Sequence, residues 1–124
     1  MSVSALFAVN AGYSGITGVI AVIASRFLAE TLEVPSWVVI GLGGGLVAFA
    51  ITLVWLRRPS RLTAAWAWLV SVADLLWVVG MVVFVVAARP SWAGSAIVLG
   101  SAAPVLALAI AQLRARRWMT GLSG

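Results

Sequence analysis

Several residue types that support soluble-protein chemistry are missing from this chain of 124 residues. It has no cysteine and no histidine, which excludes disulfides, thiol redox chemistry, zinc sites built on those side chains and histidine-ligated haem. It also has no lysine, so a lysine Schiff base to a carbonyl ligand is excluded. We therefore expect no cofactor and no metal site.

Charge is scarce as well, because charged residues make up 9% of the chain and apolar residues 64%. Soluble domains carry about 25% charged residues, and so short a chain cannot bury this much apolar surface in a core of its own. The lipid bilayer is therefore the expected surroundings. The net charge of +5 comes from arginines at the ends of apolar segments, where they would meet lipid headgroups rather than nucleic acid.

Four apolar stretches are long enough to cross a bilayer, which takes about 20 helical residues. They lie near 3–25, 36–56, 62–88 and 92–113. Each connection contains one proline, a residue that suits loops and helix starts: Pro35, Pro59 and Pro90. No stretch alternates between apolar and polar residues, as a barrel strand would. The pattern predicts an all-α fold, an integral membrane four-helix bundle that forms a single transmembrane domain.

The orientation follows from the arginines. Three of them lie in "LRRPSRL" at 56–62 and three in "LRARRWM" at 113–119, whereas the other side has only Arg26 and Arg89. By the positive-inside rule, both termini are cytoplasmic in a multi-pass protein of the inner (plasma) membrane. Six tryptophans near the predicted boundaries form an aromatic belt: Trp37, Trp55, Trp66, Trp68, Trp92 and Trp118.

Two further patterns concern how the helices pack. "PSWVV" at 35–39 and "PSWAG" at 90–94 each open a span that ends in arginines, which predicts two parallel helical hairpin repeats related by an axis along the membrane normal. Coincidence among loop residues is the alternative. Glycines at Gly12, Gly15 and Gly18, and again within 41–45, predict close helix contacts.

One carboxylate interrupts the apolar pattern, at Asp74 within "WLVSVADLLWVVGMVVFVV", residues 68–86. Counted from Leu62, it would lie about 18 Å deep in a hydrocarbon core about 30 Å thick. A charged side chain there costs at least about 2.5 kcal/mol. We therefore expect Asp74 to face the bundle interior, and to be either protonated or paired.

Polar side chains at similar depth are the candidate neighbours of Asp74. Asn10, Ser14 and Thr17 share one helical face, Gln112 lies where it can meet either Asn10 or the headgroups, and Pro104 interrupts the backbone bonding near Ser101. Trp77, one turn from Asp74, would add an aromatic wall that favours cations. The predicted ligand-binding residues are Asp74, Trp77, Asn10, Tyr13, Ser14, Thr17, Ser71 and Ser101. The same residues could instead only lock the helices together.

Three short motifs carry a resemblance: Asn10 with "YSGITG" at 13–18 in the first span, "DLLWV" at 74–78, and Gln112 before the terminal arginines. In these the chain resembles small four-span bacterial integral membrane proteins of unassigned function, and its "PSW" motifs are similar to those of SPW-repeat membrane proteins, with a different letter order. Small multidrug transporters are similar in size, but their acidic residue lies in the first span. The resemblance implies the fold and the membrane location only.

The function predicted from these features is binding or transport of a small lipophilic or cationic molecule through an intramembrane aspartate pocket between the first, third and fourth spans. The alternative is a non-catalytic structural or accessory subunit of a membrane complex. An enzyme that acts on a lipid is a weaker prediction, because one acid without a second acid, base or metal ligand is poor chemistry. The expected partners are the lipid bilayer, a small-molecule ligand and, since four helices enclose a narrow interior, a second copy in a homodimer.

Overall fold

The computed structural model describes residues 2–58 and 61–119, and this part of the chain is built from helices. Four of them are long: α1 (Val3–Ile23), α3 (Ser36–Leu56), α4 (Ala64–Ala88) and α5 (Trp92–Met119). All four are long and apolar enough to cross a membrane, which confirms the predicted helical membrane bundle. The protein is thus a multi-pass membrane protein. The predicted proline Pro59 and the side chain of Trp118 lie outside the described residues.

Capping side chains and a proline mark the starts of three helices. The Ser2 hydroxyl accepts from the Ala5 amide N–H at 3.1 Å at the start of α1, and the Thr63 hydroxyl accepts from that of Trp66 at 3.2 Å at the start of α4. Such side chains satisfy amide groups that the first turn of a helix leaves unpaired. Pro35 lies directly before α3, as predicted for a connection.

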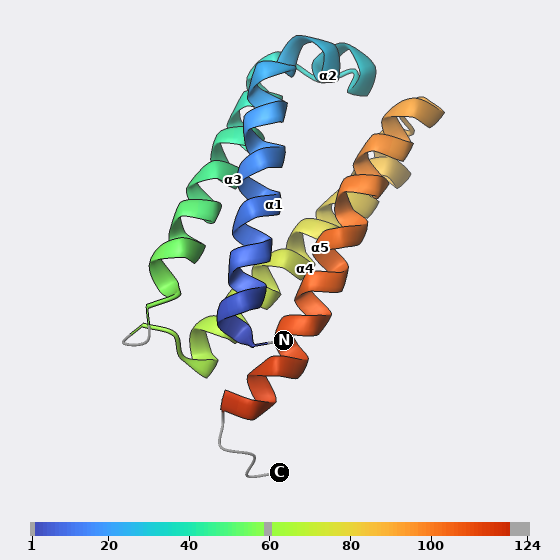
Figure 1. Cartoon of the computed structure of the whole chain (residues 1–124). Coiled ribbons are helices and arrows are strands. Elements are labelled where there is room, and N and C mark those ends of the chain that lie inside the picture. The colour runs from blue at the N-terminus through green and yellow to red at the C-terminus, as the bar shows by residue number, and fades with distance from the viewer. Residues whose placement is uncertain (1, 59–60, 120–124) are drawn as a thin grey trace.

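A fifth helix, the short α2 (Ser25–Leu32), was not predicted. The first span ends at Ile23 rather than near residue 25, and the chain bends at Ala24 before α2 begins. α2 lies across one end of the bundle, whereas both termini lie at the other end (Figure 1). Hereafter these are called the α2 end and the termini end.

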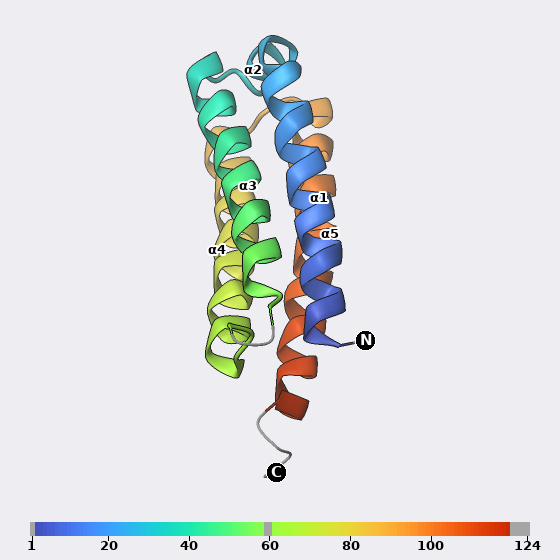
Figure 2. The ribbon, with the colours of Figure 1, turned by 60° about the vertical axis from the view of Figure 1, so that its left-hand side comes forward.

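The long helices pack as two pairs, α1 with α3 and α4 with α5. The pairs form two layers (Figures 1 and 2), and these diverge toward the α2 end (Figure 1). Contact between the layers runs mainly through α1 and α5, whereas α3 and α4 hardly touch. Each pair is a hairpin of two successive long helices, and α2 occurs in the first hairpin only. The predicted repeat between the two hairpins stays a prediction.

Close packing within the first pair depends on two glycines. A methyl group added at Gly18 would come within 2.5 Å of the Gly43 carbonyl oxygen, and one at Gly43 within 2.8 Å of the Gly18 carbonyl oxygen. Side chains would therefore hold the two backbones apart. The predicted packing role is confirmed at these two positions, whereas Gly12, Gly41, Gly44 and Gly45 have no neighbour within 4 Å of an added methyl group.

The termini half of the bundle is tightly packed. Its apolar cluster draws on all four long helices and includes Phe7, Leu53, Leu56 and Ala67, each fully buried. Arginines connect the segments at this end. Arg57 Nε donates to the Ser4 carbonyl at 3.1 Å.

Candidate functional site

Five buried polar side chains occur among the described residues, and all belong to one hydrogen-bonded network. They are Asn10 and Ser14 of α1, Ser71 and Asp74 of α4, and Gln112 of α5. Residues three or four apart share a helix face, so α1 and α4 each contribute two polar groups to the interior. The network therefore ties the two layers of the bundle together near its centre.

Two side-chain amides hold the carboxyl group of Asp74. Asn10 Nδ2 donates to Asp74 Oδ2 at 2.8 Å and to Gln112 Oε1 at 3.0 Å. Gln112 Nε2 donates to the same carboxyl oxygen at 3.0 Å and to Ser71 Oγ at 3.3 Å. Each amide thus uses both of its N–H groups, and both bonds to the carboxyl group reach Oδ2.

The remaining polar atoms of the network also have partners. Ser14 Oγ donates to Asn10 Oδ1 at 3.1 Å, and Ser71 Oγ donates to the Ala67 carbonyl at 2.8 Å. In the described part of the chain, no fully buried side-chain nitrogen or oxygen lacks a partner. Asp74 Oδ1 receives no hydrogen bond from the residues described, so it must retain some accessible surface. It is the one open hydrogen-bonding position of the network.

Asp74 lines a cavity of about 270 Å³ that lies mostly between α3 and α4. We call it the aspartate cavity. Gly41, Gly45 and Phe49 of α3 form one wall, and Ala73 and Trp77 of α4 flank the carboxyl group on the other. We infer that the open oxygen of Asp74 meets this cavity, because the residue is buried overall yet lines it.

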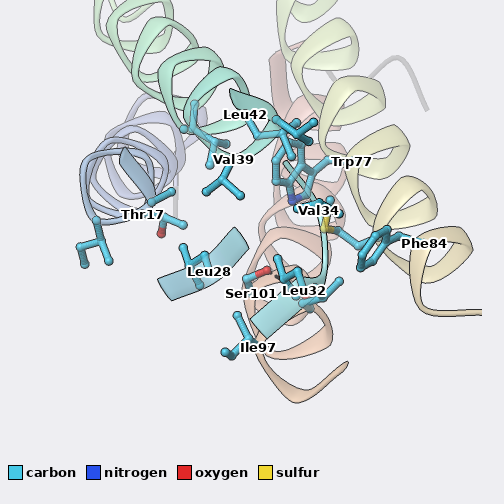
Figure 3. Close-up of a pocket in the computed structure, with 17 residues that line it drawn as sticks. Thr17, Leu28, Leu32, Val34, Val39, Leu42, Trp77, Phe84, Ile97 and Ser101 are labelled. Atoms are coloured by element: carbon cyan, nitrogen blue, oxygen red, sulfur yellow. Dashed lines mark hydrogen bonds between the residues drawn. The ribbon is translucent and has the colours of Figure 1, made fainter. Parts of the chain in front are cut away.

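A second cavity of about 290 Å³ occupies the α2 half of the bundle, and we call it the apolar cavity. Its walls are almost entirely aliphatic and aromatic side chains (Figure 3). Leu28 and Leu32 of α2 line it beneath the α2 end. Leu42, Leu46 and Trp77 line both cavities. Asp74 thus lies at the boundary between a packed half and a hollow half of the molecule.

The predicted site residues fall into two groups. Asn10, Ser14, Ser71 and Asp74 come together in the network, whereas Thr17, Trp77 and Ser101 line the apolar cavity. The predicted pocket position is wrong in one respect, because α3 supplies much of the wall beside Asp74. Asn10 lines neither of the two cavities, since it is fully buried.

Tyr13 was expected to line the ligand site with Asp74, but its hydroxyl bonds to α5 instead. Its hydroxyl donates to the Ser101 carbonyl at 2.6 Å, and Ser101 Oγ donates to the Val98 carbonyl at 2.8 Å. Pro104, inside α5, has no N–H and so cannot bond the carbonyl four residues earlier. Both hydroxyls therefore bond backbone carbonyls of α5 close to this proline, but neither bonds the Gly100 carbonyl that lies four residues before it.

Two parts of the site were missed from the sequence. Gln112 was not placed among the site residues, although a fully buried glutamine within an apolar span carries the same signal as Asn10. The wall from α3 offers no polar residue to detect. In the sequence this wall is marked only by Gly41 and Gly45, which look like ordinary packing glycines. The structure shows that both are exposed and line the cavity.

No known protein family, curated protein or solved structure matches this chain. The class of protein must therefore come from its own fold and site. These define a multi-pass helical membrane protein with a carboxyl group held by amides at the edge of an intramembrane cavity.

Proposed function

We propose that this protein binds, or carries, a small lipophilic molecule whose polar head is a cation or a hydrogen-bond donor. The observation that carries the proposal is the open Oδ1 atom of Asp74 beside the aspartate cavity. A carboxylate oxygen accepts hydrogen bonds and attracts positive charge. The described hydrogen-bond donors to this carboxyl group are amides rather than cations, so none of them supplies the positive charge that its ionised form would attract.

The shape of the surroundings supports the same ligand class. The apolar cavity gives a lipophilic body room in almost purely hydrophobic surroundings, and Trp77 lines both this cavity and the aspartate cavity. Small-molecule sites are commonly apolar with a few placed polar groups, and start at about 300 Å³. The indole of Trp77 also attracts a cation through its ring face. We propose transport across the inner membrane as the form in which a bacterial cell uses this binding.

The second candidate function is a structural subunit of a membrane complex, in which Asp74 only fixes the helices. One observation favours it, because the other polar atoms of the network satisfy each other without a ligand. Such a network could lock the two layers together. The two functions differ in whether the open Oδ1 atom binds a ligand.

The experiment is native mass spectrometry of the wild type and of Asp74→Asn, purified identically in mild detergent, followed by titration with dodecylamine. Asparagine keeps an oxygen that can accept the two amide bonds, and turns an uncharged NH₂ group toward the cavity. We expect dodecylamine binding to weaken by about 10- to 100-fold, as loss of a hydrogen bond to a charged group predicts.

A retained natural ligand would appear in the same spectra as a bound mass in the wild type that is absent from the variant. Equal dodecylamine binding by both proteins, with no retained mass in either, would refute the binding function. It would then favour the structural subunit, particularly if a stoichiometric membrane protein copurified.

A further inference from the structure

The helices that line the aspartate cavity indicate where a ligand can enter it. α3 and α4 both border the aspartate cavity, yet they hardly touch each other. Small side chains face the gap from both helices, because Gly41 and Gly45 of α3 and Ala73 of α4 are all exposed and all line the cavity. Near the middle of a spanning helix, an exposed residue faces the hydrocarbon of the bilayer.

Apolar side chains line the bundle at both of its ends. At the termini end, a ligand from water would meet the packed cluster that includes Phe7, Leu53 and Leu56, each fully buried. At the α2 end, Leu28, Leu32 and Val34 line the apolar cavity (Figure 3). Neither end offers a polar path to Asp74, whereas the side between α3 and α4 offers an opening with small residues on both walls.

We infer that ligands reach Asp74 sideways, from the hydrocarbon core of the bilayer through the opening between α3 and α4. This inference rests on the proposed function and narrows its ligand class to molecules that dissolve in the membrane: amphiphiles with a long apolar body and one small donor head. A strongly hydrated ion or sugar would not be a ligand, since it does not enter hydrocarbon.

The glycines provide a matched pair of variants. Gly45 borders the aspartate cavity, whereas its neighbour Gly44 borders neither cavity. Both are exposed, and an added methyl group at either has no neighbour within 4 Å. Leucine should therefore fit at both positions without disturbing the fold, but only Gly45→Leu would fill the opening.

The probe is dicyclohexylcarbodiimide, a carboxyl reagent that dissolves in lipid, applied to the protein in liposomes. A protonated carboxyl adds across one C=N bond of the reagent and rearranges to a stable N-acylurea, so the adduct gains the whole reagent mass and nothing leaves. The side-chain carboxyls of the chain are Glu30, Glu33 and Asp74. A water-soluble cationic carbodiimide with an added amine serves as the comparison, and exposed Glu30 and Glu33 report its activity.

We expect the lipid-soluble reagent to label Asp74 in the wild type and in Gly44→Leu, and the labelling to be lost in Gly45→Leu. Ala73→Leu, which fills the opening from α4, should have the same effect as Gly45→Leu. The water-soluble reagent should label the two glutamates and leave Asp74 unmodified. Peptide mass spectrometry reads all three sites in one sample.

Labelling of Asp74 by the water-soluble reagent, or equal labelling in Gly45→Leu and Gly44→Leu, would overturn the lateral route. Absence of labelling in the wild type would overturn it too. These outcomes are separate from the dodecylamine titration, because an amine that binds at Asp74 after arriving from water supports the binding function and not the route.

Discussion

At the scale of single residues, the site depends on a few hydrogen bonds between buried side chains. Asn10 and Gln112 each donate two bonds and meet at the same carboxyl oxygen, Asp74 Oδ2. Both amides are fully buried, so removal of either leaves buried groups without a partner. In such a network, the two amides should not act independently.

The first prediction at this scale is energetic coupling between the two amides. Asn10→Ala and Gln112→Ala should each lower the free energy of unfolding by about 1–3 kcal/mol, because each leaves buried partners unpaired. The double variant should depart from the sum of the two by about 0.5 kcal/mol or more. Unfolding in mixed micelles, followed by circular dichroism, measures all three.

The control pairs Asn10→Ala with Thr52→Ala. Thr52 is exposed, and its hydroxyl donates to the Ala48 carbonyl of its own helix, so the two positions share no partner. Their effects should add to within about 0.5 kcal/mol. Additive behaviour of Asn10→Ala with Gln112→Ala as well would contradict the shared network.

At the scale of elements, the helices are held in pairs by different means. The first pair packs backbone against backbone at Gly18 and Gly43, whereas contact between the two pairs runs mainly through α1 and α5. Where no hydrophobic force drives helices together in lipid, such close backbone contact supplies much of the association. The divergence of the layers toward the α2 end leaves space for the apolar cavity.

The prediction at this scale is a sharp difference between glycines. Gly18→Ala and Gly43→Ala should each lower the free energy of unfolding by about 1–3 kcal/mol, since a methyl group would force the two backbones apart. Gly44→Ala should cost nothing, because its position is open. Thermal unfolding of the four proteins in one detergent tests this, and equal melting temperatures would contradict the proposed contact.

At the scale of the whole molecule, the termini end is packed and the α2 end is hollow. Several arginines make contacts at the packed end. Arg57 and Arg116 donate to backbone carbonyls at the termini end, while Arg61 lies 4.0 Å from the ring centre of Trp55. The positive-inside rule predicts that this is the cytoplasmic end, which would place the apolar cavity in the outer half of the membrane.

The orientation can be tested directly because the chain has no cysteine of its own. Ser36→Cys at the α2 end and Ala65→Cys at the termini end each introduce one thiol at an exposed position. We expect a membrane-impermeant maleimide to label Ser36→Cys in intact bacterial cells, and Ala65→Cys only after permeabilisation. The reverse pattern would invert the topology, and equal labelling of both in intact cells would indicate insertion in both directions.

The sequence by itself determined the helical membrane fold and the inward position of Asp74. The length and apolar character of four segments leave little choice in lipid, because every backbone group must be satisfied within its own helix. A carboxyl group at mid-span must turn inward, because a charged side chain that faces hydrocarbon is costly. Asn10, Ser14 and Ser71 were correctly placed near it, because helical periodicity and depth are local properties of the chain.

Only the tertiary structure decided which helices border the cavity and which oxygen of Asp74 remains open. Helical periodicity identifies a face but not its neighbour, so neither the gap between α3 and α4 nor the convergence of Asn10 and Gln112 on Oδ2 could be read from spacing. The short α2 was missed because its eight residues are fewer than the window of about 11–18 residues over which helical periodicity is judged. The gap and the convergence share one physical reason: both depend on how separate helices pack, which is set by side-chain contacts between segments distant in the chain.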